Sequence, residues 1–276
     1  MNSNLYTIEA ISNLHAGSGD VNYGVVDNLI QRDAITDLPV INSSSLKGAF
    51  REHCKTSLRE EEIAQLFGSD PKSSDRKVGS YRFFDAYLLA MPVRSDKSPF
   101  LMATCPMILE AVLNKNELFN IGLSNQMKNV LHKLISLKST YQVPLVFCED
   151  FKEASIEDLN EILTKYQKIE GIEYIGALMG NAPLVLVDDK EFRILCDNNH
   201  LPVIARNYLN NGKSENLFYE QVLPRLSRLY FILMHPDRND HEKLNGTLKD
   251  TLVQIGANAS VGYGYCKITP FDNLNK

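Results

Sequence analysis

Alternating apolar and polar side chains mark the beginning of the chain as a strand. Over residues 5–11, Leu, Thr, Glu and Ile alternate with Tyr, Ile and Ala, the period of a half-buried strand. Apolar stretches predict further strands at 81–89, 100–109 and 229–234, and a glycine-rich segment predicts another at 261–268.

Helical spacing of apolar residues predicts four helices. The first begins at Ser43, within Ser43-Ser44-Ser45, where serine side chains can accept hydrogen bonds from the first backbone N–H groups. Leu46, Phe50 and Cys54 then share one face. The other three helices are expected at 122–137, at 155–167 with Ser155 and Asp158 as a capping pair, and at 241–254 ending before Gly256.

Two segments around Asn210-Asn211-Gly212-Lys213 predict a β-hairpin over 203–222. Without the middle third, the element order is strand, helix, strand, strand, helix, strand. This order predicts an α+β fold with a ferredoxin-like (RRM-like) βαββαβ core. We expect a single domain over residues 1–276, with its core at about 1–111 and 226–276. A large helical insertion over about 112–225 carries the hairpin.

Composition narrows the class of protein. The chain has 276 residues, 44% hydrophobic and 23% charged, which is a globular balance. Five scattered cysteines without a C-x-x-C pair indicate neither zinc nor disulfides and favour a reducing, cytoplasmic location. We expect no secretory leader and no membrane partner. A net charge of −5 argues against coating nucleic acid by bulk charge, but it permits a local basic groove.

Two segments could hold an anion. The helix beginning at Ser43 combines free N–H groups with Lys47 and Arg51, an arrangement that binds phosphate. A capped surface helix with solvated basic residues would have the same sequence. The glycines at 256, 262 and 264 could form a backbone anion nest, although a helix stop followed by a bulged strand would also explain them. Neither segment has the context of a Walker loop or a dinucleotide site.

Asp27 lies in a long early loop, 16–42, and His15 directly precedes this loop. An exposed loop carboxylate can act as a general base or bind a metal ion; a turn aspartate and a structural histidine are the plainer alternatives. The polar group His235, Asp237, Asp240 and His241 is expected to form a turn and helix cap, not a metal site. The cysteines, Cys148 included, are expected to pack as small apolar groups.

Together, several motifs resemble the RAMP superfamily and, within it, the fourth-subunit (backbone) family of type III-B CRISPR Cmr effectors. The motifs are LHAGSG at 14–19, GVVDNLIQR at 24–32, LPVINSSSLKG at 38–48, FDA at 84–86, PVR at 92–94, LFYE at 217–220 and QIGANASVGYG at 254–264. The chain departs from the family pattern at Asp37, Ala257 and Ala259.

The resemblance implies a function. Copies of such a subunit stack along a guide CRISPR RNA with other Cmr subunits, and each copy pushes a hairpin thumb, here 203–222, between guide and single-stranded target RNA. The target is cut at regular intervals in a reaction that needs a divalent metal, Mg²⁺ or Mn²⁺, which we expect to bind only with RNA. Asp27 matches the residue implicated in cutting, and the resemblance leaves open whether it acts as the base or as the metal ligand. The resemblance further implies that the RNA is bound by His15, Ser44, Ser45, Lys47, Arg51, Arg206, Gly256, Gly262 and Gly264.

Two alternatives remain open from the sequence. One is a guide-binding backbone subunit without cleavage, of the kind found in related DNA-targeting complexes. The other is a ribonuclease of the same superfamily that processes CRISPR RNA with a histidine base, for which His15 is the candidate. Asp27 on its glycine-flanked loop favours cleavage of target RNA.

Overall fold

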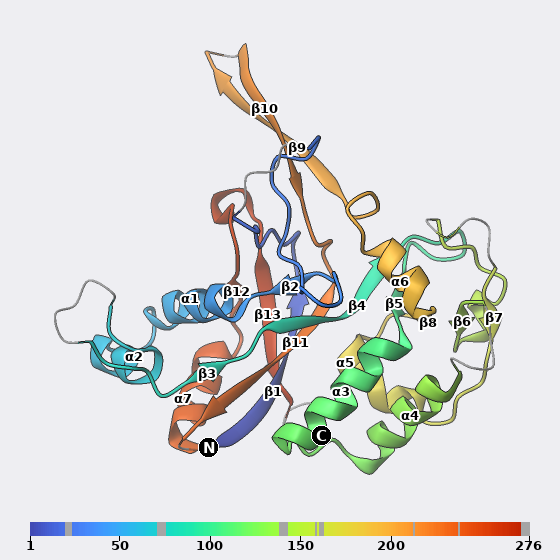
Figure 1. Ribbon diagram of the computed structural model, residues 1–276, viewed down its shortest axis with the longest axis horizontal. Coiled ribbons are helices and arrows are strands. Elements are labelled where there is room, and N and C mark those ends of the chain that lie inside the picture. The colour runs from blue at the N-terminus through green and yellow to red at the C-terminus, as the bar shows by residue number, and fades with distance from the viewer. Residues whose placement is uncertain are drawn as a thin grey trace.

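The structure, a computed structural model, describes residues 1–19, 24–70, 76–137, 143–157, 159, 163–211, 213–236 and 238–271. An eleven-stranded mixed sheet runs through the molecule, with helices on both faces (Figure 1). Among the described residues, no helix has the length and apolar character needed to cross a bilayer.

The centre of the sheet is built from four antiparallel strands in the order β13-β1-β11-β4. They are β1 (Asn2–Ala10), β4 (Ala86–Val93), β11 (Arg228–His235) and β13 (Tyr265–Pro270). Thr7 of β1 lies opposite both Tyr230 and Thr269. Strands from the two ends of the chain therefore lie side by side in the sheet.

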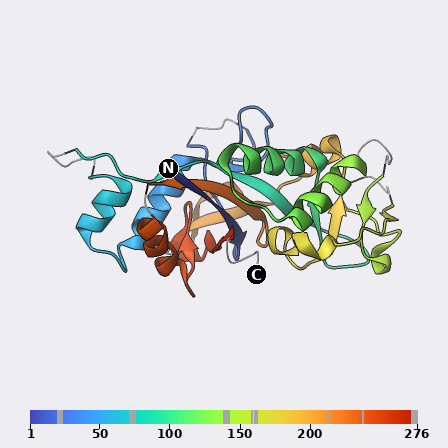
Figure 2. The same cartoon turned by 90° about the horizontal axis from the view of Figure 1, so that it is seen from below.

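Neighbouring side chains of β11 point to opposite faces of the sheet, and each face is covered by helices. The Phe231 ring packs against Phe50 of α1 (Ser43–Cys54) at 5.4 Å. The Tyr230 ring faces the other way, where Lys115 of α3 (Pro106–Phe119) lies 5.3 Å from its centroid. Figure 2 shows α3 on one side of the sheet and α7 (Arg238–Leu248) on the other.

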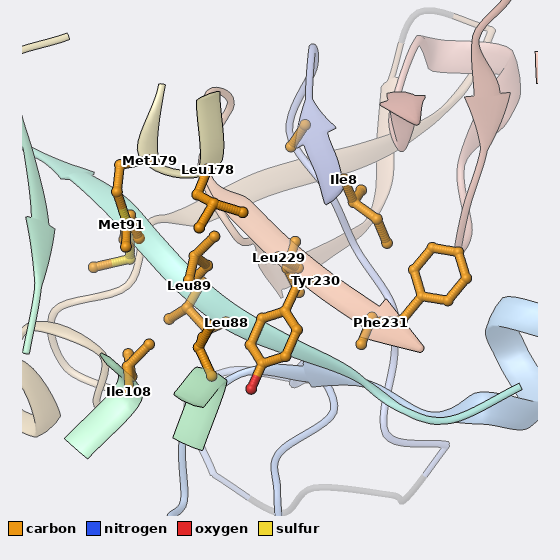
Figure 3. Close-up of a cluster of buried hydrophobic side chains, with 14 of the residues drawn as sticks. Ile8, Leu88, Leu89, Met91, Ile108, Leu178, Met179, Leu229, Tyr230 and Phe231 are labelled. Atoms are coloured by element: carbon orange, nitrogen blue, oxygen red, sulfur yellow. The ribbon is translucent and has the colours of Figure 1, made fainter. Parts of the chain in front are cut away.

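The predicted insertion does more than add helices, because three short strands extend the sheet beyond β5 (Leu101–Thr104). They are β8 (Leu184–Leu186), β6 (Leu145–Val146) and β7 (Lys165–Tyr166). Strand β8 pairs with β5 in parallel. The buried cluster in Figure 3 joins Ile8, Leu229 and Phe231 of the central strands to Leu178 and Met179 of α5 (Gly176–Met179). The segment predicted to be an insertion thus shares one hydrophobic core with the two ends of the chain.

The remaining elements are short, apart from α4 and the hairpin. They are β2 (Val40–Ile41), α2 (Glu60–Phe67), β3 (Arg82–Phe83), α4 (Asn125–Ser136), α5 (Gly176–Met179), α6 (Asp189–Leu195), β12 (Val253–Gln254) and the 3₁₀ turns Glu149–Phe151, Ile172–Ile175 and Ala259–Val261.

The predicted hairpin is present as a separate two-stranded sheet of β9 (Val203–Asn210) and β10 (Lys213–Gln221). Its strands pair from Val203–Gln221 at the base to Asn210–Lys213 near the turn. The hairpin projects away from the rest of the molecule (Figure 1). Gly212 of the predicted turn lies outside the described residues.

Several predicted elements are wrong or misplaced. Among the described residues of 155–167 there is no helix: Ser155 bridges Leu163, and 165–166 is strand β7. Asp158 lies outside the described residues. The strand expected over 100–109 ends at Thr104, because helix α3 begins at Pro106. Proline fits the first position of a helix, where its missing N–H costs nothing.

Boundaries also differ at the C-terminal end. The helix expected over 241–254 ends at Leu248, because Asp250 has a left-handed φ of 56° and Val253–Gln254 pair with β13. The expected strand over 261–268 begins only at Tyr265. The strand expected over 81–89 is split into β3 and β4, whose partners differ in register along β11.

All five cysteines are free, and four are buried as predicted. The prediction for Cys148 is wrong: its side chain is exposed, with Sγ 3.7 Å from Asp150 Oδ2. His235 and His241 are buried, and their rings stack at 4.9 Å. Asp237 of that predicted polar group lies outside the described residues.

Candidate functional site

An open cleft of about 660 Å³ lies where the early loop, the start of α1 and the glycine-rich loop meet. Its lining includes four of the predicted site residues: His15, Asp27, Ser45 and Gly256. A second hollow of about 530 Å³ shares Ser45 and Gly256 and adds Ser44. The two hollows therefore adjoin at Ser45 and Gly256, near the start of α1.

The base of β10 holds the loop that carries Asp27. The Tyr219 backbone N–H donates to Asp27 Oδ2 at 2.7 Å, and the N–H groups of Asp27 and Asn28 both donate to Tyr219 O at 3.1 Å. Asn28 also forms a parallel bridge to Glu220. The Asp27 carboxylate is exposed, but its backbone and one of its oxygens are fixed to the hairpin.

Glu220, the next residue of β10, joins three segments of the site. Its buried carboxylate accepts from Arg206 Nη1 at 2.8 Å, from Asn258 Nδ2 at 2.9 Å and from Asn28 Nδ2 at 3.4 Å. These donors come from β9, the glycine-rich loop and the Asp27 loop. The charge of the predicted RNA ligand Arg206 is therefore already partnered within the protein. No pattern in the sequence indicates this role for Glu220.

Gln221 completes the scaffold by fixing His15. The buried His15 ring donates from Nδ1 to Gln221 O at 2.7 Å, because a carbonyl can only accept. The other ring nitrogen, Nε2, lies next to Gly17, because a Cβ added to Gly17 would come within 3.1 Å of Nε2. His15 thus has a structural role in the cleft, and its Nε2 lies next to Gly17, which also lines the cleft.

Gln31 links the early loop to α1. Its Nε2 donates to Gly17 O at 3.1 Å and to Ser45 Oγ at 3.0 Å, and its Oε1 accepts from the Asn42 N–H at 2.7 Å. The side chain is buried and satisfied. Gln31 lies within the GVVDNLIQR motif at 24–32, but a lone glutamine in a loop does not indicate this role.

The start of α1 is capped differently from the prediction. The Ser43 N–H donates to Asp85 Oδ1 at 2.6 Å, and the N-cap residue Asn42 makes no side-chain cap. Ser45 Oγ instead accepts from Gln31. A carboxylate of the chain itself therefore occupies the positive end of this helix, where a phosphate was expected.

Lys47 and Arg51 line neither of these two hollows, unlike Ser44 and Ser45. Arg51 Nη1 donates to Gly68 O at 2.5 Å, at the end of α2. Partial burial, together with the charges of Arg82 and Arg51, lowers the pKa of the Lys47 ammonium. Lys47 and Arg51 thus lie on the α2–β3 side of the helix.

The glycine-rich loop needs glycine at two of its three predicted positions because of close packing. A Cβ on Gly256 would lie 2.2 Å from His15 O, and one on Gly264 would lie 2.0 Å from Ile255 O. Both residues have left-handed φ values, 85° and 74°. Gly262, at φ 85°, has no atom within 4 Å of its Cβ position. Gly256 and Gly264 bring the loop against the His15 segment.

The described residues contain no group of three His, Cys, Asp or Glu side chains that could hold a metal ion. Mg²⁺ commonly takes one or two carboxylates and completes its shell with phosphate oxygens and water. The exposed Asp27 carboxylate fits such a site only as one ligand among others supplied by a bound nucleic acid.

The RAMP superfamily matches residues 7–267, nearly the whole chain. The chain belongs to the RAMP superfamily. It is 28% identical, over 98% of its length and 96% of the relative's, to the CRISPR system Cmr endoribonuclease Cmr4 of Pyrococcus furiosus.

Two solved structures share the fold of this RAMP protein along nearly its full length. A chain of the type III-B Cmr-beta complex bound to cognate target RNA gives a TM-score of 0.80 at 19% identity and 99% coverage of both chains. Oligomeric Cmr4 from Pyrococcus furiosus gives 0.69 at 24% identity, with 98% of both chains covered. The likeness extends over the inserted segment and the hairpin as well as the central strands.

Proposed function

We propose that this RAMP protein is a guide-RNA-binding backbone subunit of a type III-B CRISPR effector and that it cuts target RNA with Asp27. The observation that carries the proposal is the attachment of the Asp27 loop to the base of the hairpin, through Tyr219. A relative named as a Cmr endoribonuclease, similar over nearly the full length, supports it. A similar fold in a Cmr complex bound to target RNA supports RNA as the partner.

The core is proposed to be ferredoxin-like. The order β13-β1-β11-β4 is the 4-1-3-2 order of a βαββαβ unit, with α1 and α7 as its helices. The hairpin is proposed to be a thumb that enters the guide–target duplex, since it projects from the molecule and its tip is remote from the core. Copies of the chain and other Cmr subunits are the proposed partners along the guide.

The chemistry follows from the geometry of RNA. A 2′-hydroxyl attacks its own phosphate only when it lies in line with the leaving 5′-oxygen, and A-form stacking prevents this alignment. A thumb that displaces a nucleotide would relax the stack beside it. Because Asp27 is hydrogen-bonded to the hairpin, its carboxylate would stand next to the displaced nucleotide and could accept the 2′-hydroxyl proton.

A divalent metal is proposed as the cofactor, with Asp27 as its one protein ligand among the described residues and RNA phosphates as further ligands. When bound, such an ion stabilises the charge that develops on the phosphate. The residues of this chain would fix the loop, bind the strand and position the base.

The test uses the complex assembled with guide RNA. Purified assemblies should contain short RNAs with a common 5′ sequence, and labelled target should be cut at a regular spacing when Mg²⁺ is present. Asp27→Asn should assemble and bind target but not cut. If wild type binds guide and target without cutting, the chain is the non-catalytic backbone; if His15→Ala alone abolishes cutting, the histidine-based processing enzyme is correct.

A further inference from the structure

We propose that a rigid turn at residues 33–37 of one copy of this chain docks into a hollow beside α5 of a second copy. The turn presents one apolar side chain and one carboxylate, and the hollow presents an apolar lining and two cations. The contact rests on the proposed function for the stacking of copies along a guide, and it names the surfaces that meet. The hollow shares no lining residue with the Asp27 cleft.

Hydrogen bonds hold the turn in one shape. Asp33 Oδ1 accepts from the Ile35 N–H at 3.2 Å, and the Asp37 N–H donates to Asp33 O at 2.9 Å. Arg32 Nη1 donates to Asp37 O at 2.6 Å, and Arg32 Nη2 donates to Cys196 O at 2.8 Å at the end of α6. A turn that is fixed before binding loses little conformational entropy when it docks.

Two side chains of this turn are exposed to solvent. Ile35 is 90% exposed, the most of any large apolar side chain among the described residues. Asp37 is exposed as well, and in the described part of the chain its carboxylate has no ion-pair partner. Its φ of 61° is left-handed, where glycine would be less strained. The chain departs from the family pattern at Asp37, so this carboxylate is a feature of this chain.

The hollow has a volume of about 490 Å³ and an apolar lining on which an isoleucine side chain can pack. Phe100 and Met102 contribute to this lining from β5 and the residue before it, Met179 from α5, and Leu226 from the segment before β11. Leu226 has a left-handed φ of 73°, which is uncommon for a leucine. Backbone strain of this kind tends to persist where a surface is used.

Three charged side chains line the same hollow in a row across the sheet. Glu9 of β1 lies opposite Arg228 of β11 and opposite Lys267 of β13. Arg228 Nη2 pairs with Glu9 Oε2 at 2.9 Å, whereas Lys267 has no ion pair among the described residues. The row has two cations and one carboxylate, so it attracts a second carboxylate.

The Arg228 guanidinium can accept that second partner. Its side chain is only 17% exposed, and Glu9 is its one ion-pair partner in the part of the chain that the structure describes. Ser227 Oγ is the only buried side-chain N or O atom without a hydrogen bond among the described residues, so the remaining Arg228 N–H groups reach the open hollow. A Cβ on Gly180 would lie 3.1 Å from Nε, and glycine there keeps the guanidinium in place.

The two surfaces suit a head-to-tail contact. The charge of Lys115 on α3 acts on the Asp33 carboxylate, which places the turn on the α3 side. Figure 2 shows α3 (green) and α5 (yellow) on opposite sides of the sheet. A contact between two different surfaces leaves one of each free in a pair, so copies can add in an open stack. One turn in one hollow buries little area, so the contact should be weak without a shared guide.

The experiment measures sedimentation of the RNA-free full chain over a range of concentrations. Lys267→Glu and Asp37→Lys should each weaken self-association roughly tenfold, because each places like charges together. An equal mixture of the two variants should associate like wild type, since every reversed turn can then meet a reversed hollow. Lys133→Glu, the same charge reversal on an exposed residue of α4, should change nothing.

A second pair of variants tests the apolar part of the contact. Ile35→Ser should weaken association, whereas Leu118→Ser, which changes a side chain of α3 that is 80% exposed, should not. Misfolding cannot explain the expected pattern, because two misfolded variants would not restore association when mixed.

A wild type that stays monomeric at every concentration, or a mixture that fails to recover, would overturn the contact. Guide retention and target cutting by wild type are measured separately. Normal cutting without the charge-swap pattern overturns the contact alone. Self-association with that pattern, but without guide retention or cutting, overturns the proposed function alone.

Discussion

The carboxylate of Asp27 accepts a hydrogen bond from the backbone N–H of Tyr219, with 2.7 Å between Oδ2 and N. The two residues are 192 positions apart, and the bond ties the early loop to the strand that forms the hairpin. Three consecutive residues of β10 thereby fix Asp27, Asn28 and His15. The hairpin and the candidate catalytic loop form one structural unit.

Asp27→Asn should separate binding from cutting. Asparagine keeps the size of the side chain and its acceptor for the Tyr219 N–H, but it cannot take a proton or carry charge. Guide and target binding should be near wild type, and cleavage should slow by at least ~100-fold, the low end of general acid–base catalysis. A time course on labelled target RNA with Mg²⁺ measures the rate. His15→Ala, assayed in parallel, should cost less, and a wild-type rate for Asp27→Asn would reject Asp27 as the catalytic residue.

Deleting residues 209–216 should leave the protein folded but remove the regular cleavage pattern. The deleted tip lies beyond the positions where β10 holds Asp27 and His15, and exposed hairpin tips tolerate change. Unfolding midpoints should stay close to wild type, while product lengths on a gel lose their fixed spacing. Unchanged product lengths would mean that the thumb is another part of the chain.

Glu220→Gln should loosen the site as a whole. The buried carboxylate accepts from Arg206, Asn258 and Asn28, and its loss leaves the Arg206 charge without its partner. Breaking one side of a buried pair typically costs about 3–5 kcal/mol, and we expect the lower part of that range because Arg206 is partly exposed. Urea unfolding measures the loss. Glu157→Gln, which removes an exposed partner of Arg94, is the control and should cost less than about 1 kcal/mol.

Two glycines of the C-terminal loop offer a matched comparison. Gly256 and Gly262 both have φ near 85°, but only Gly256 would place a Cβ against backbone, 2.2 Å from His15 O. Gly262→Ala should cost about 1–2 kcal/mol, the strain of a left-handed residue. Gly256→Ala should cost clearly more and should displace His15. Chemical denaturation measures both, and equal losses would show that close approach to His15 is not what requires glycine.

Asp33 should make the early loop acid-sensitive. Its Oδ1 accepts from the N–H groups of Ile35 and Thr36 and from Thr36 Oγ1. Burial raises the pKa of this carboxyl, and the hydrogen bonds lower it by more, so the net pKa is below the ordinary value. A depressed folded-state pKa stabilises the protein above the unfolded value, about 3.9, and this stabilisation is lost as pH falls through the folded value.

Asp33→Ala should therefore lower the free energy of unfolding by about 1 kcal/mol at neutral pH, and the difference from wild type should shrink below about pH 4. Urea unfolding at neutral and acid pH measures both values. Glu117→Ala, which removes an exposed carboxylate of α3, is the control for the loss of one negative charge. A constant difference for Asp33→Ala at every pH would contradict the assigned hydrogen bonds.

The sequence by itself determined the features that depend on local periodicity and turn chemistry. Strand β1, the buried face of α1 with Leu46, Phe50 and Cys54, the hairpin and the strand β11 all lie where their patterns predict. Motif resemblance also singled out Asp27, Ser45 and Gly256 before any geometry was known, and these residues do line one cleft.

Only the tertiary structure decided how these parts are fixed. The partner of Asp27 is 192 positions away, and the carboxylate that caps α1 is 42 positions away, in the segment between β3 and β4. Segment 155–167 has helical spacing, yet its described residues pair as bridges and strand because β6 offers Tyr166 a partner. Pairing energy between distant segments outweighs local propensity there, and no pattern along the chain records which distant groups will meet.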